Sequence, residues 1–252
     1  MTPIDPTSDP IAASPAADSQ SPTARSPFFD YADLFFFIAL AIPSLFLAYA
    51  IVAGARFIVP ISKPAQALLI QIVWYVLIFG ALAVLFRIRY HKPLWSSLDW
   101  RGVAITTSLG ALLAGPVLAL ALGLLGSALR APDIQLPFEQ MLESRSTLVL
   151  LGLLLVVLGP IAEELAFRGF LMPLLIRTLG AAGGVVLTGI IFGSLHGYEY
   201  KWSWQFMLLV SVVGCIFGWV KYKTRSTITS ALMHATFNLT QFAALLVQAQ
   251  NT

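Results

Sequence analysis

Residues 146–176 read STLVLLGLLLVVLGPIAEELAFRGFLMPLLI, and the only ionisable side chains in this apolar run are Glu163, Glu164 and Arg168. A helix that crosses a bilayer needs roughly 20 predominantly apolar residues. The run is long enough, so it predicts a membrane span rather than a helix of a soluble domain. Ionisable side chains inside a span are costly and mostly functional, so these three residues are the first candidates for a site.

The composition of the whole chain agrees with a membrane protein. Of its 252 residues 58% are hydrophobic and only 11% are charged, whereas a typical soluble domain is about 25% charged. A single soluble core rarely grows beyond ~250–300 residues, so one soluble domain could not bury this much apolar surface. The composition excludes a soluble globular protein, a disordered chain and a nucleic-acid binder. The net charge of +3 says little by itself.

Further runs with little or no charge follow the same pattern as the first. We therefore expect an all-α polytopic bundle of about seven spans, with a range of six to eight because Pro43, Pro116 and Pro160 can kink or break helices. The predicted organisation is a disordered polar tail over 1–28, three spans over 29–144 and a helical core over 145–252. The other six runs are 34–55, 64–86, 102–129, 178–198, 202–220 and 226–252.

The distribution of lysine and arginine predicts the orientation. With seven spans and the N-terminus inside, ten of these residues fall in inner segments and five in outer segments. Cytoplasmic loops carry the excess of Lys and Arg, and the short segments 87–101 and 221–225 contribute most of it. We expect an integral protein of a bacterial inner (plasma) membrane with a cytoplasmic N-terminus.

Three more polar residues lie within the last runs: His196, His234 and Asn238. At 1.5 Å rise per residue, the polar groups of three spans reach the same level of the bilayer to within ~10 Å. Glu164 and Arg168 are four residues apart and can pair, whereas Glu163 is rotated by about 100° and is free to face a cavity.

These residue types suit hydrolysis by an activated water molecule. A carboxylate in apolar surroundings can act as a general base, a histidine can hold the same water, and Asn and His donors can stabilise an oxyanion. The alternatives are a structural Glu164–Arg168 pair with His234 and Asn238 bonding between helices, hence a non-catalytic membrane scaffold or immunity-type partner, or a proton-coupled transporter. The single Cys215 allows no disulfide within the chain.

Three short motifs resemble those of a known family. Glu163 to Arg168 fits E-E-x-x-x-R, Phe192 to His196 fits F-x-x-x-H, and His234 to Asn238 fits H-x-x-x-N. In this order, each on its own hydrophobic run, they resemble the CPBP intramembrane proteases. That family includes type II CAAX prenyl endopeptidases, bacteriocin-processing or immunity proteins and Abi proteins. The resemblance covers roughly residues 145–245.

The resemblance implies roles for six residues. Glu163 would activate water with help from His196, Glu164 and Arg168 would support the site, and His234 and Asn238 would form the oxyanion hole. The family is read either as metal-free glutamate proteases or as metalloproteases. The second reading would give Glu163, His196 and His234 to a divalent ion such as zinc, and the lack of standard zinc spacing favours the first. The implied partners are membrane lipids and a membrane-embedded or lipid-modified protein substrate, without nucleic acid.

Overall fold

The computed structural model describes residues 27–134, 139–142 and 144–250, and every regular element within them is helical. The predicted all-α bundle is therefore confirmed, while the predicted polar tail lies outside the described residues except for Pro27 and Phe28. The elements before residue 145 are α1 (Tyr31–Ala55), α2 (Lys63–Tyr90), α3 (Leu94–Ser97), α4 (Ile105–Ala128) and η1 (Glu139–Leu142). Those that follow are α5 (Arg145–Leu153), η2 (Leu154–Leu158), α6 (Gly159–Glu163), η3 (Glu164–Leu171), α7 (Met172–Leu195), α8 (Trp204–Thr224) and α9 (Thr227–Gln250).

The described residues hold six helical runs long and apolar enough to cross a membrane, and one of these, Arg145–Leu195, has 51 residues. A straight helix of that length would measure about 76 Å, more than twice the ~30 Å hydrocarbon core. Gly180 breaks the run with φ 74° and ψ 173°. A Cβ on Gly184 would lie 2.6 Å from the backbone nitrogen of Ile176, so the chain turns back there. The run provides two passes, and the predicted seven spans are accounted for.

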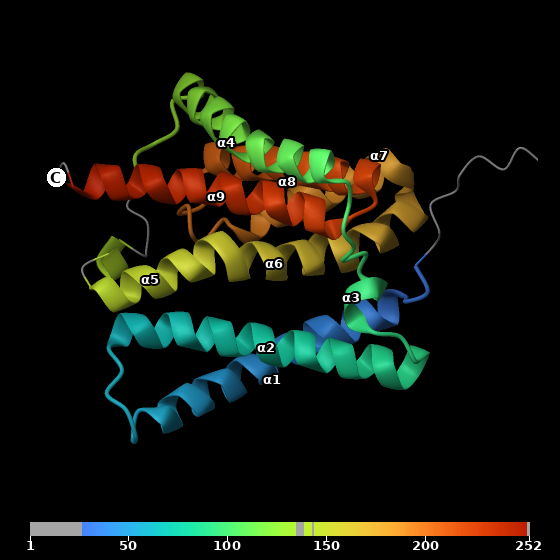
Figure 1. The fold of residues 1–252 in the computed structure, drawn as a ribbon, viewed down its shortest axis with the longest axis horizontal. Coiled ribbons are helices and arrows are strands. Elements are labelled where there is room, and N and C mark those ends of the chain that lie inside the picture. The colour runs from blue at the N-terminus through green and yellow to red at the C-terminus, as the bar shows by residue number, and fades with distance from the viewer. Residues whose placement is uncertain (1–26, 135–138, 143, 251–252) are drawn as a thin grey trace, which may run out of the picture.

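Helices α1 and α2 run antiparallel, as do α7 and α8, whereas α4 and α9 run parallel to each other (Figure 1). Glycines bring α4 close to α9 and α7 close to α8. Gly115 of α4 lies against α9, where an added Cβ would be 2.5 Å from the carbonyl oxygen of Met233. Gly189 and Gly193 of α7 meet α8 in the same way. Small residues permit such close approach of membrane helices. The outer faces remain apolar, with Phe46 71% exposed, as suits contact with lipid tails.

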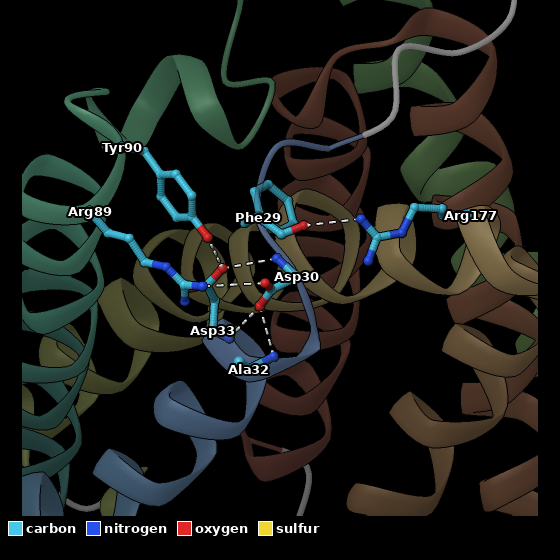
Figure 2. A network of polar contacts seen from close by, with 7 residues as sticks. All are labelled: Phe29, Asp30, Ala32, Asp33, Arg89, Tyr90 and Arg177. Atoms are coloured by element: carbon cyan, nitrogen blue, oxygen red, sulfur yellow. Dashed lines mark hydrogen bonds and ion pairs between the residues drawn. The ribbon is translucent and has the colours of Figure 1, made fainter.

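A polar network fixes the start of α1 against the end of α2 (Figure 2). Asp30 caps α1 and forms a capping box with Asp33, and the backbone N–H of Asp33 helps hold the pKa of Asp30 below its usual value. The buried carboxylate of Asp33 accepts hydrogen bonds from Arg89 Nη1 and Tyr90 Oη, both at 2.6 Å. This network therefore joins the first two helices at the end of the bundle where α1 begins and α2 ends.

Candidate active site

Four of the six predicted site residues line one cavity of about 520 Å³: Glu163, His196, His234 and Asn238. Glu163 ends α6, His196 follows the last residue of α7, and the other two lie on α9. The predicted meeting of polar groups from three spans is confirmed. Glu163 keeps 27% of its side chain exposed, whereas that of His234 is 5% exposed, so the carboxylate is the more accessible of the two groups.

Glu164 and Arg168 lie behind the cavity and are fully buried. Arg168 Nη1 donates to Glu164 Oε1 at 2.8 Å, and Nη2 donates to the carbonyl oxygen of Gly214 at 2.9 Å. The guanidinium lies 4.5 Å from the Phe192 ring centroid and 5.5 Å from that of Phe217, a cation–π arrangement. The predicted i,i+4 pair exists, and it ties η3 to α8 rather than facing the cavity.

The backbone before Glu163 changes its hydrogen-bond register, and the sequence explains how. The N–H of Gly159 bonds to the carbonyl of Leu154 five residues back, within the π-helical turn η2. In that register the carbonyl of Leu155 would accept from residue 160, but Pro160 has no N–H to give. Asn238 Nδ2 donates to this carbonyl at 2.8 Å instead. Pro160 therefore leaves open the acceptor that fixes the Asn238 amide beside the cavity.

His234 connects the buried pair to the cavity. Its Nδ1 lies 3.0 Å from Glu164 Oε1 and its Nε2 lies 3.8 Å from Glu163 Oε2. A carboxylate oxygen only accepts, so Nδ1 carries a proton and Nε2 is the nitrogen that faces Glu163. The ring stacks on Phe217 with a centroid distance of 4.6 Å.

His196 is oriented by the phenylalanine of its own motif. Its Nδ1 lies 2.7 Å from the carbonyl oxygen of Phe192, which can only accept, so Nδ1 is the donor. In the neutral imidazole the lone pair is then on Nε2. The Phe192 ring packs 4.5 Å from the His196 ring centroid and also covers Arg168. One side chain thus links the second motif to the buried ion pair of the first.

Glu199 and Tyr200 were not among the predicted site residues, yet both line the same cavity. Burial raises the pKa of the Glu199 carboxyl above its usual value, and the neighbouring His196 opposes that rise. The spacing of Glu199 three residues after His196 was visible in the sequence. It could not be interpreted because the turn after α7, not a helix, carries it back to the cavity.

A metal site is not formed by the residues that the sequence offered for one. Among the described residues no group of three or more His, Cys, Asp or Glu side chains is arranged to hold a metal ion. Catalytic zinc sites use three protein ligands with an open fourth position. The described geometry therefore gives no support to a zinc site at Glu163, His196 and His234, and the steps proposed below use no metal ion.

Comparison with known proteins gives one match. Residues 145–240 match the family model described as type II CAAX prenyl endopeptidase, Rce1-like. All three motifs and the whole ion-pair system fall within those residues. No curated protein and no solved structure matches the chain.

Proposed function

We propose, from the Rce1-like domain at residues 145–240, that this membrane protein is an endopeptidase that cuts a peptide bond of a membrane-associated substrate. The observation that supports it best is the position of the accessible Glu163 beside His196, His234 and Asn238 in one cavity. The family is one of intramembrane proteases, and the cavity supplies a base, oriented imidazoles and an amide donor. This favours a hydrolase over a scaffold.

The proposed reaction begins with Glu163 taking a proton from water as the water oxygen attacks the peptide carbonyl carbon. His196, whose Nε2 bears the lone pair, holds the same water. The carbonyl oxygen becomes an oxyanion that accepts from protonated Nε2 of His234 and from the second N–H of Asn238. The C–N bond then breaks as Glu163 returns its proton to the leaving nitrogen. No proton or charge is left over, and no metal takes part.

Glu164 and Arg168 position rather than react. Glu164 accepts a hydrogen bond from Nδ1 of His234 and so orients the ring, and Arg168 holds Glu164. Because neither residue lines the cavity, neither would touch the substrate. The substrate itself would be a membrane-embedded or lipid-modified polypeptide, since the cavity lies among helices that face lipid.

Substitution of His196 tests the proposal with a matched control in the same chain. We expect purified protein treated with a metal chelator to cleave its substrate, and His196→Ala to lose about 10²-fold or more of that activity. The exposed His91 lies outside the cavity, so His91→Gln should cleave like the wild type. The substrate is the polypeptide that accumulates uncut in the membranes of cells with an inactive variant, and the readout is its cleavage by the purified protein. Equal cleavage by both variants would contradict the role of His196, and loss of activity on chelation would contradict a metal-free reaction.

The orientation decides from which side a substrate enters. The cavity is lined by residues 131–134 after α4 and by Glu199 and Tyr200 after α7, which lie at the same end of the bundle. The basic segments 87–101 and 221–225 lie at the other end. With those segments inside, the N-terminus is cytoplasmic and the cavity opens toward the outer face of the membrane.

Thiol labelling checks this orientation in whole cells. In a Cys215→Ser background, Asp133→Cys should react with a membrane-impermeant reagent, because Asp133 is exposed beside the cavity. Ser96→Cys, exposed in the basic segment at the opposite end, should react only after the cells are opened. The reverse pattern would place the N-terminus outside.

A further inference from the structure

A second cavity, of about 1250 Å³, lies at the end of the bundle opposite the mouth of the active-site cavity. Its lining comes from the stretch before α1, from the α2–α4 connection, from η3 and α7, and from the end of α8. It is strongly basic, with a single carboxylate, that of Asp99. The basic residues of its lining are Lys92, Arg101, Arg177, Lys221, Lys223 and Arg225.

Hydrogen bonds and close packing build this cavity into the fold. Thr227 donates through its backbone nitrogen to the Asp99 carbonyl at 3.0 Å and through its hydroxyl to the Leu98 carbonyl at 2.6 Å. On the other side, a Cβ on Gly169 would lie 2.9 Å from Leu98 Cβ. The connection that carries Asp99 is therefore held against α9 and η3.

The charges that line the cavity do not balance. Asp99 already pairs with Lys221 at 3.1 Å and with Arg101. Six cations and one carboxylate leave a formal charge of +5. The four cations that do not contact Asp99 form no ion pair with any described residue: Lys92, Arg177, Lys223 and Arg225. A structural salt-bridge network would carry carboxylates for these groups, so the excess charge points to an anion from outside.

Three of these four cations are held by neutral groups. Lys92 Nζ lies 4.1 Å from the centroid of the Phe28 ring and Lys223 Nζ lies 4.6 Å from that of Trp219. Arg177 donates to the carbonyl oxygen of Phe29 at 3.4 Å, as Figure 2 shows. Such contacts orient a cation without neutralising it. The groups stay available for a ligand with several acceptor oxygens.

We propose that this cavity binds a phosphate-bearing anion, and that the anion is supplied by the headgroup of an acidic phospholipid. Phosphate oxygens are strong acceptors for clustered Lys and Arg, and basic pockets at the ends of membrane helices bind anionic headgroups. The lining of the cavity also includes the aromatic residues Phe28, Trp100 and Tyr222, which suit the membrane interface. The proposal is independent of the proteolytic function, since no residue of this cavity lines the active-site cavity.

A lipid titration of the delipidated full-length protein tests the proposal. The probes are phosphatidylglycerol, phosphatidylcholine and inorganic phosphate, with binding read by native mass spectrometry in a neutral detergent. The variant Lys92→Gln/Lys223→Gln/Arg225→Gln removes three cations that no described carboxylate holds, so the fold should survive. We expect its affinity for phosphatidylglycerol to fall by about tenfold or more. The zwitterionic lipid should bind weakly to variant and wild type alike.

The matched control removes three exposed cations from the opposite end of the molecule, as Arg56→Gln/Lys63→Gln/Arg130→Gln. This control should bind phosphatidylglycerol like the wild type. Displacement of the lipid by inorganic phosphate would support the phosphate chemistry and identify a free phosphate as a sufficient ligand. Failure of phosphate to displace it would support the lipid as the source. Equal losses in the two triple variants, or no loss in the first, would overturn the proposal.

Discussion

Glu163→Gln is expected to abolish cleavage, with a fall in kcat of about 10²–10⁴-fold, the range attributed to general-base catalysis. The amide has the same shape as the carboxylate but cannot accept the proton of the attacking water. Substrate binding should change little, because the residue keeps its size and its place at the end of α6. The measurement is single-turnover cleavage of the accumulated membrane polypeptide in detergent or in vesicles.

The fold should tolerate this substitution, which separates a catalytic from a structural role. The described contacts of the Glu163 carboxylate include only the 3.8 Å approach to His234, so the melting temperature should stay near that of the wild type. Glu163→Asp retains a base but withdraws it from the cavity, and we expect intermediate activity. A Glu163→Gln protein that cleaves at the wild-type rate would refute the assignment of the base and leave the scaffold interpretation standing.

Arg168→Met is expected to cause the largest loss of stability, about 3–5 kcal/mol, which is the cost of leaving a buried charge without its partner. Glu164 is fully buried, and its Oε2 already lacks a hydrogen-bond partner. Removal of the guanidinium would leave His234 as the remaining partner of that carboxylate. The loss appears as a lower melting temperature of the purified protein.

The double variant Glu164→Gln/Arg168→Met supplies the control for this second prediction. It removes both charges, so it should be more stable than Arg168→Met alone while remaining poorly active, since His234 loses the carboxylate that holds its proton. The surface substitution Arg56→Met, at an exposed residue, should leave the melting temperature unchanged. A single variant that melts like the wild type would show that the pair does not hold η3 in place.

Helical periodicity was enough to predict part of the geometry of this site from the sequence. The 100° rotation between Glu163 and Glu164 predicted that one would face a cavity and the other would pair with Arg168, and the structure places them so. The local geometry of a helix depends on spacing alone, so such statements need no knowledge of neighbours. The catalytic roles of these residues remain predictions that the experiments above address.

The side-chain contacts between different helices could not be predicted in this way, because they depend on tertiary packing. Nothing in the sequence indicated that Asn238 would donate a hydrogen bond to the carbonyl oxygen of Leu155, which Pro160 leaves without a backbone donor. The packing of the Phe192 ring over Arg168 could not be predicted either. Glu199 was overlooked for the same reason, since its return to the cavity depends on the turn after α7. Each contact joins segments that are distant in sequence or connected by an irregular turn.

The sequence by itself determined that the chain lies in a membrane, that its fold is all-α and which few polar residues lie within the spans. An apolar chain with 11% charged residues has few polar groups to place inside a membrane. The tertiary structure decided how those groups divide. It put Glu163, His196, His234 and Asn238 on one cavity, Glu164 and Arg168 behind it, and six cations around another cavity at the far end. The physical reason is that burial and charge balance are properties of packed helices, which no single helix carries.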